Sequence, residues 1–213
     1  MYAAKSLPRQ GLYAITHCRI LNTEQLLSKT EQILQGGVAM LQYRHKDADA
    51  ELQFIQASML RKLCAQYGIP FIINDDPELA RLLHADGVHL GREDMDCRQA
   101  RELLGPDSII GVSCYNESAR VKTAVTDGAS YIALGAFYPT QTKSDAIRAE
   151  PGLIGRIKQI LTLPVVAIGG ITPENGQFLV EAGADFLAVS SGLYEPADTC
   201  QAVQNYMTLF KQL

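Results

Sequence analysis

The loop around residue 140 carries side chains that are well suited to bind a phosphate group. Residues 135–143 read Gly-Ala-Phe-Tyr-Pro-Thr-Gln-Thr-Lys and directly follow the apolar run 131–134. Thr140, Thr142 and Lys143 supply two hydroxyls and an ammonium group, which can donate to several oxygens of one anion. In chains built from repeated strand-helix units, ligands bind just past the carboxyl ends of the strands. A solvated surface turn would have the same composition, so the other motifs decide between the two interpretations.

A second polar group follows an earlier apolar run. Gln42, Arg44 and Lys46 alternate along the chain, so an extended backbone would place an amide and two cations on one face. Such a face can bind a charged phosphate. The alternative is a strand end that turns into solvent, with His45 and Asp47 adding ordinary surface charge.

Carboxylates follow the next two apolar runs. Asn74, Asp75 and Asp76 come directly after one run, and Asp94 comes after the other. Acidic side chains on adjacent strand ends suit Mg²⁺, which takes oxygen ligands and is often shared with a substrate diphosphate. We therefore expect Asp75 and Asp94 to bind the metal. Helix capping is the alternative for each acid taken alone, because each precedes residues that resemble a helix start.

Small and hydroxyl-bearing residues end the later apolar runs. Ser113 ends one run, Gly169 and Gly170 end another, and Ser190 and Ser191 end the last. Exposed backbone N–H groups and a helix start at the last two positions would form a phosphate cradle. A tight turn and a helix cap are the structural alternatives. We expect a second anion site there.

Two reactive residue types are not expected to take part in the chemistry. His89 lies inside an apolar run and is predicted to be a hydrogen-bonded core histidine rather than a base. Cys114 has no partner in the sequence that would make it a nucleophile. No catalytic triad is apparent.

These side chains need a scaffold that brings separate strand ends together. Short β-type runs alternate with helical patterns along the whole chain, which is typical of parallel strand-helix units. The predicted strands are Gly11–Ile15, Met40–Tyr43, Phe71–Ile73, Gly87–Leu90, Ile109–Val112, Tyr131–Leu134, Val165–Ile168 and Phe186–Val189. Eight such units favour an α/β fold, a single-domain (β/α)8 TIM barrel over residues 1–213, although a doubly wound open sheet would give a similar pattern.

Two helix starts are predicted from their capping signals. Asn22 with Gln25 three residues later predicts a helix start, and Gly36-Gly37 predicts its end. Thr172 followed by proline predicts a second helix that runs to about Gly183.

Composition restricts the class of protein. The chain has 213 residues, 47% of them hydrophobic, and a net charge of −4 with no long run of one sign. This balance gives no reason to expect nucleic-acid or membrane binding, so the expected partners are small molecules. The five cysteines are scattered and odd in number, and no signal sequence or membrane span is apparent, which predicts a cytoplasmic protein with reduced thiols. The oligomeric state stays open, a homo-oligomer included.

With these residues assembled, the chain resembles the thiamine phosphate synthase (thiamine-phosphate pyrophosphorylase) family over nearly its whole length. The matching motifs occur in the family's order. They are Gly36-Gly37 leading to Gln42-x-Arg44-x-Lys46, Ile73-Asn74-Asp75, Gly87 to Met95, Gly111-Val112-Ser113, Gly135 to Lys143, Ala167 to Ile171 and Val189-Ser190-Ser191.

The resemblance implies a transferase with Mg²⁺ on a (β/α)8 barrel. The family joins 4-amino-2-methyl-5-hydroxymethylpyrimidine diphosphate to a thiazole phosphate, giving thiamine phosphate and pyrophosphate. Diphosphate leaves first, and the thiazole nitrogen captures the pyrimidine-methyl cation. By likeness, Asp75 and Asp94 hold Mg²⁺; Arg44, Lys46, Asn74 and Lys143 contact the diphosphate; Gln42 and Ser113 face the pyrimidine; and Thr140, Thr142, Gly170, Ser190 and Ser191 position the thiazole phosphate. Lys143, Arg44 and Ser113 are the expected catalytic residues.

Three positions depart from the family pattern. Asp76 stands where arginine is common, His45 stands where an acid is common, and Gln141 lies within the Pro-Thr-x-Thr-Lys loop. The extra carboxylate beside Asp75 either points away or changes the metal shell. Two rival functions share these features in part: a thiazole tautomerase-like relative and a non-catalytic barrel that binds a phosphorylated metabolite. Retention of the cations and acids argues against the tautomerase, which has no diphosphate to neutralise.

Overall fold

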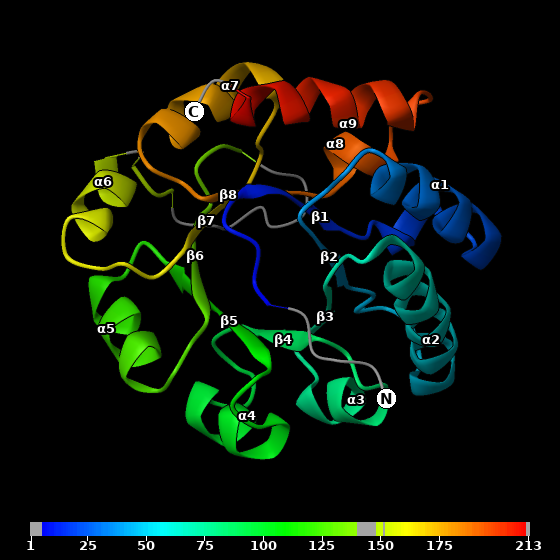
Figure 1. Ribbon diagram of the computed structural model, residues 1–213, viewed down its shortest axis with the longest axis horizontal. Helices are drawn as coiled ribbons and strands as arrows, with labels where there is room; N and C mark the ends of the chain where they lie inside the picture. Colours follow the sequence, from blue (N-terminus) through cyan, green and yellow to red (C-terminus); the bar gives the residue numbers. More distant parts are fainter. Residues whose placement is uncertain (1–5, 140–147, 151, 212–213) are drawn as a thin grey trace.

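Eight parallel strands close into a barrel in the computed structural model, which describes residues 6–139, 148–150 and 152–211. Each strand pairs with the next one along the chain, and β8 pairs with β1 to complete the ring. The helices surround this ring (Figure 1). Closure between the first and last strands confirms the predicted (β/α)8 barrel and excludes the open sheet, whose edge strands would stay unpaired.

The strands follow the apolar runs of the sequence. They are β1 Gly11–Ile15, β2 Met40–Tyr43, β3 Phe71–Asn74, β4 Gly87–Leu90, β5 Ile109–Tyr115, β6 Tyr131–Gly135, β7 Val165–Ile168 and β8 Phe186–Val189. Five match the predicted bounds, whereas β3, β5 and β6 continue further at their carboxyl ends. Asn74 pairs with His89 and Tyr115 with Leu134, so polar residues at the rim belong to the sheet.

Helices connect the strands around the outside of the barrel. They are α1 Thr23–Gln35, α2 Ala50–Tyr67, α3 Pro77–Leu82, α4 Cys97–Leu104, α5 Ser118–Thr126, α6 Gly152–Lys158, α7 Pro173–Glu181, α8 Ser191–Tyr194 and α9 Thr199–Met207, with short 3₁₀ turns at Cys18–Ile20 and Thr208–Phe210. Asn22 and Gln25 form the capping box that begins α1, and Thr172 caps α7, as predicted. Reciprocal side-chain bonds satisfy backbone N–H groups that the first helical turn leaves without partners.

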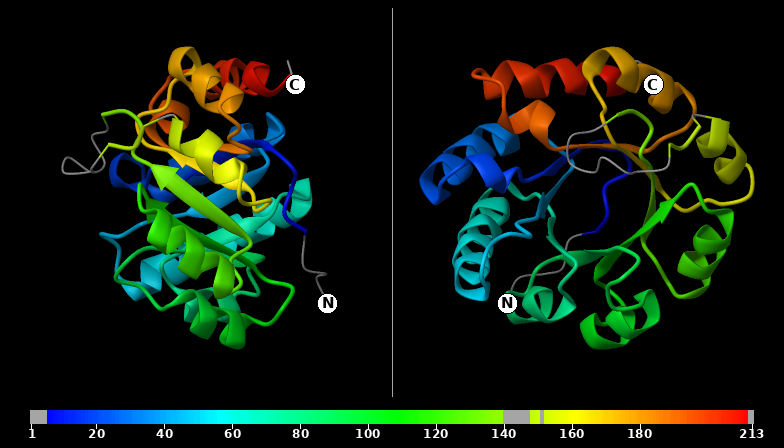
Figure 2. Two further views of the ribbon diagram at one scale, coloured as in Figure 1. Left: turned by 90° about the vertical axis from the view of Figure 1, so that its left-hand side faces the viewer. Right: turned by 180° about the vertical axis from the view of Figure 1, so that it is seen from behind.

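Two layers of buried side chains hold the structure together. The larger one lies between strands and helices, and the smaller one fills the barrel interior with residues such as Met40, Tyr131 and Phe186. The N-terminal segment crosses the end of the barrel where the strands begin, and Leu7 packs against the interior layer (Figure 1). In the side view of Figure 2, β6 points away from that segment. The opposite end, where the strands finish, is therefore the open rim.

Within the described residues, no helix is both long enough and apolar enough to cross a membrane.

Candidate active site

The structure brings most of the predicted site residues to the carboxyl rim of the barrel. Gln42 ends β2 with Arg44 and Lys46 just beyond it, Asn74 is the last residue of β3, and Ser113 lies near the end of β5. The predicted phosphate-loop residues Thr140, Thr142 and Lys143, with Gln141, lie outside the described residues. Their place at the rim stays a prediction from the sequence.

Lys46, Asp75 and Asp94 form one contiguous cluster at this rim. Lys46 Nζ lies 2.6 Å from Asp75 Oδ2, and the carboxyl groups of Asp75 and Asp94 are near enough to shift each other's pKa. Asp94 Oδ2 also accepts the backbone N–H of Gly91 at 2.6 Å. Asp75 has a φ of 65°, a left-handed conformation that aspartate tolerates better than most residues. Side chains from three separate loops thus meet at one point.

The two carboxyl groups have opposite pKa shifts. Burial opposes ionisation of Asp75 and is the largest single influence, but bonds to Lys46 and Asp94 together with the Lys46 charge outweigh it and lower its pKa. Burial, followed by the hydrogen bond to Asp75 and its negative charge, raises the pKa of Asp94. The pair therefore holds a proton more readily than two isolated carboxylates would. A cation placed between them would relieve the same repulsion.

The donor set at this cluster fits a hard cation. Among the described residues, no group of three or more His, Cys, Asp or Glu side chains is arranged to hold a metal. Two neighbouring carboxylates suit Mg²⁺ because this ion usually keeps waters and shares one or two carboxylates with substrate phosphates. An all-protein cage, as for structural zinc, is not required.

The residues that cap the helices here are acids next to the predicted metal ligands. Asp76 Oδ1 accepts the N–H of Leu79 and caps α3, and Asp96 is the cap of α4. Asp75 and Asp94 are thus not occupied as helix caps. The same observation resolves the Asp76 departure, because this extra carboxylate is turned toward the start of α3.

His45, the second departure, also faces the protein. Its Nδ1 lies 2.9 Å from Gln56 Oε1 on α2, and Gln56 in turn accepts from the Tyr43 hydroxyl. Arg44 is fixed through its backbone, since its N–H donates to Thr16 Oγ1 at 2.8 Å. The substitution of an acid by histidine therefore alters the contact with α2.

A hydrogen-bonded row of side chains runs beneath the rim, through the barrel interior. It links Gln42, Tyr13, Tyr131, His89 and Ser113 in that order. The prediction of a hydrogen-bonded core histidine is confirmed for His89. The sequence did not predict the roles of the two tyrosines, because both lie within apolar runs. The one sequence signal for the position of Tyr131 is Gly111, which pairs with it and leaves room for its ring.

The glycine-serine set lies at the ends of β7 and β8. Gly170 has a φ of 60°, and a Cβ there would lie 2.2 Å from the carbonyl oxygen of Pro139. The residues leading into the predicted phosphate loop therefore rest directly on Gly170, and Tyr138 N–H donates to Gly169 O at 3.0 Å. Backbone contact, which only glycine permits here, thus holds Tyr138 and Pro139 against the end of β7.

The two serines at the end of β8 occupy different positions. Ser190 Oγ lies 3.4 Å from the Thr16 carbonyl oxygen and 3.5 Å from His17 Nδ1, so it faces the end of β1. Ser191 begins the short helix α8. Both stand on the same rim as the carboxylate pair.

Comparison with known proteins identifies the lineage of this barrel. Residues 12–193 match the sequence profile described as "Thiamine monophosphate synthase". The chain belongs to the thiamine monophosphate synthase family. It is 50% identical over 203 residues to a thiamine-phosphate synthase of Xanthomonas campestris, covering 95% of this chain and 97% of the relative. It is 48% identical over 200 residues to one of Thiobacillus denitrificans, covering 94% of each.

A solved structure supports membership of the thiamine monophosphate synthase family. Thiamine phosphate pyrophosphorylase from Pyrococcus furiosus superposes with a TM-score of 0.85 at 31% identity, and the match covers 96% of both chains. Thiamine-phosphate synthases are transferases, so the chain is placed among enzymes rather than among structural barrels. The suspected family resemblance is confirmed.

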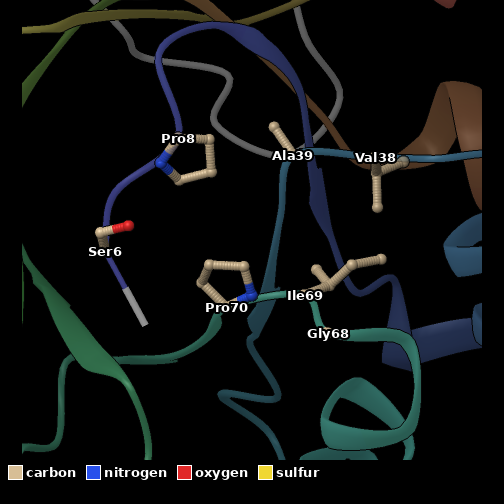
Figure 3. Close-up of a pocket in the computed structure, with 7 residues that line it drawn as sticks. All are labelled: Ser6, Pro8, Val38, Ala39, Gly68, Ile69 and Pro70. Carbon is tan, nitrogen blue, oxygen red and sulfur yellow. The ribbon is translucent and has the colours of Figure 1, made fainter. Parts of the chain in front are cut away.

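A pocket of about 470 Å³ lies at the other end of the barrel, where the strands begin. Figure 3 shows its lining, which consists of Ser6, Pro8, Val38, Ala39, Gly68, Ile69 and Pro70. None of these side chains carries a charge. A pocket without ionisable side chains is unsuited to the phosphorylated molecules named for this family, so we assign the site to the rim.

Proposed function

We propose that this protein is a thiamine phosphate synthase that couples hydroxymethylpyrimidine diphosphate to a thiazole phosphate with release of pyrophosphate. The observation that carries the proposal is the cluster of Lys46, Asp75 and Asp94 at the rim. A bound diphosphate needs a metal ion and cationic side chains, and this cluster offers two carboxylate ligands for the metal beside one cationic side chain. Family membership over residues 12–193 supports the same reaction.

Asp75 and Asp94 would hold Mg²⁺, which supplies charge neutralisation for the departing diphosphate when it is bound. Arg44, Lys46, Asn74 and Lys143 would contact the diphosphate oxygens. Ammonium and guanidinium groups stabilise negative charge as it accumulates on the leaving group, which lowers the barrier to bond cleavage. The positive charge left on the pyrimidine methyl group would be captured by the thiazole nitrogen.

The second substrate would be held by the glycine-serine set. Gly170, Ser190 and Ser191, together with Thr140 and Thr142, would bind the thiazole phosphate. Fixing the nucleophile next to the reacting carbon converts a bimolecular step into an effectively unimolecular one. Gln42 and Ser113 would orient the pyrimidine. Because the nitrogen already carries its lone pair, the reaction needs positioning and charge stabilisation more than a general base.

Pyrophosphate release with both substrates and Mg²⁺ tests the proposal. Release that depends on the thiazole phosphate and stops with a chelator is the expected result. A thiazole tautomerase-like relative would change the thiazole substrate alone without releasing pyrophosphate. A non-catalytic barrel would bind one phosphorylated ligand and release nothing. Either of these last results would refute the proposed reaction.

We place the protein in the cytoplasm. The five cysteines Cys18, Cys64, Cys97, Cys114 and Cys200 form no disulfide, and four of them are buried. Burial raises the pKa of Cys18 to about 11 and that of Cys97 to about 11, so these thiols stay protonated. Cysteines that are kept as thiols rather than disulfides support a reducing compartment.

A further inference from the structure

We infer that a buried hydrogen-bonded row of side chains from Gln42 to Ser113 fixes which of its two ends offers a donor, and which an acceptor, to a bound ligand. The row thereby selects an aminopyrimidine. Tyr13, Tyr131 and His89 are then positioning residues for substrate specificity. This inference rests on the proposed function, because it takes Gln42 and Ser113 to be the residues that face the pyrimidine.

The row is continuous and buried. Gln42 Nε2 lies 2.9 Å from the Tyr13 hydroxyl, which lies 2.8 Å from the Tyr131 hydroxyl. Tyr131 is 3.0 Å from His89 Nδ1, and His89 Nε2 is 2.9 Å from Ser113 Oγ. Tyr13 and Tyr131 are 1% and 0% exposed. Water therefore has no access to the two hydroxyls in the middle of the row.

The direction of the first bonds follows from the number of protons available. Gln42 donates an amide N–H to the Tyr13 oxygen. Tyr13 has one proton of its own, and its other hydrogen-bond partner is the Tyr131 hydroxyl. If Tyr131 supplied the proton instead, the buried proton of Tyr13 would have no acceptor among its described contacts, so Tyr13 donates to Tyr131.

The direction then passes through the histidine. Tyr131 accepts from Tyr13, so its own proton goes to His89 Nδ1, which must be unprotonated to accept it. Neutral His89 then carries its proton on Nε2 and donates it to Ser113 Oγ. Ser113 consequently has its hydroxyl proton available for a ligand. The tautomer of His89 is thus set by a bond on the far side of its ring.

Reversal of one bond would disturb the entire row. Two donors or two acceptors would then face each other in a buried place, which leaves a buried polar group unsatisfied. The rings are also held in position: His89 stacks on Tyr131 with centroids 5.7 Å apart, and Tyr13 meets Tyr131 edge-on at 5.9 Å. A Cβ on Gly111 would lie 2.0 Å from Tyr131 Cζ, so the ring fills the space that this glycine leaves.

The two ends therefore offer complementary groups to a ligand. Gln42 turns its N–H₂ group toward Tyr13 and uses one N–H in the row, and its amide oxygen is the acceptor at that end. Ser113 offers a donor at the other end. An aminopyrimidine presents an N–H₂ donor next to a ring-nitrogen acceptor, which matches this pattern. The corresponding oxo-pyrimidine presents a carbonyl acceptor next to a ring N–H donor, which is the opposite pattern.

The tautomer of His89 provides a test that needs no turnover. Two-bond ¹H–¹⁵N correlation spectra of the ¹⁵N-histidine-labelled protein near neutral pH distinguish the two neutral forms, and the His89→Gln spectrum assigns the signal. We expect the form protonated on Nε2 alone. A proton on Nδ1, alone or together with Nε2, would overturn the inferred direction.

Substrate discrimination tests the consequence. Tyr131→Phe removes the central hydroxyl and keeps the ring that stacks on His89. Tyr194→Phe is the matched control, because it removes an equally buried hydroxyl whose partner is Thr30, 2.9 Å away and outside the barrel interior. We expect the wild type and the control to prefer the amino over the oxo substrate by about tenfold or more in kcat/KM, and Tyr131→Phe to lose most of that preference.

The outcomes separate the inference from the proposed function. An unchanged preference in folded Tyr131→Phe would overturn the role of the row. If the wild type joined neither pyrimidine to the thiazole phosphate, the proposed function would fail, while the tautomer of His89 would still decide the direction of the bonds. If Tyr131→Phe did not fold, the tautomer would again decide it.

Discussion

Asp75→Asn separates a metal-binding role of this carboxylate from a structural one. The substitution removes one charge and keeps the shape of the side chain. Asparagine also tolerates the φ of 65° at this position. Alanine would add about 1–2 kcal/mol of backbone strain in the left-handed region, which would confuse loss of function with loss of stability.

The effect of Asp75→Asn on stability should be small. The ion pair that it breaks is partly exposed, with 52% of the Lys46 side chain and 25% of the Asp75 side chain accessible. Pairs of this kind contribute about 0.2–1 kcal/mol. Removal of the charge next to Asp94 offsets part of this loss. We therefore expect the free energy of unfolding in urea to change by less than about 1 kcal/mol.

The effect on catalysis should be much larger. Substitutions that only orient metal ligands cost about 10–100-fold in affinity or activity, so loss of a direct ligand should lower kcat/KM by about a hundredfold or more. Pyrophosphate release measured over a range of Mg²⁺ concentrations should show part of this loss as weaker metal binding.

Asp76→Asn is the matched control for this experiment. It makes the same chemical change one residue later, at a side chain that caps α3, and asparagine is an equally good cap. We expect activity close to that of the wild type. If Asp75→Asn were as active as Asp76→Asn, the assignment of Asp75 to the metal would be wrong.

Three further predictions follow from other parts of the chain. Lys143→Ala should lower kcat by about a hundredfold or more with unchanged thermal unfolding, and full turnover would refute its role at the leaving group. Burial and Asp75 raise the pKa of Asp94, and a carboxyl group must lose its proton to bind a metal. When the pH is lowered, Mg²⁺ affinity measured by calorimetry should therefore begin to fall at a higher pH than an ordinary carboxylate would give. A fall only at the ordinary carboxyl pKa would contradict this. Gly111→Ala should reduce the free energy of unfolding in urea by about 1–3 kcal/mol, because the added Cβ meets Tyr131 at 2.0 Å; unchanged stability would show that the ring can move.

The barrel could be predicted from the sequence because parallel strands covered on both faces are continuous apolar runs. Gly87–Leu90 and Val165–Ile168 are examples whose bounds match those of the structure. The start of α1 could be predicted because Asn22 and Gln25 satisfy each other's backbone within one helical turn. These signals are local, so one short window contains all the interacting groups.

The features that could not be predicted depend on contacts across the barrel. Nothing near Tyr13 in the sequence indicates that its hydroxyl meets that of Tyr131, 118 residues away. The extra length of β5 depends on its pairing with β6. The choice between Asp75 and Asp76 as the cap of α3 was also open, because two adjacent acids fit the same local pattern and only backbone geometry separates them.

A crystal structure with Mg²⁺ and pyrophosphate would test the central claim most directly. The account predicts that one Mg²⁺ lies between the carboxylates of Asp75 and Asp94 and that pyrophosphate lies against Lys46 at the rim where the strands end. Pyrophosphate bound elsewhere, with no Mg²⁺ between the two carboxyl groups, would contradict it.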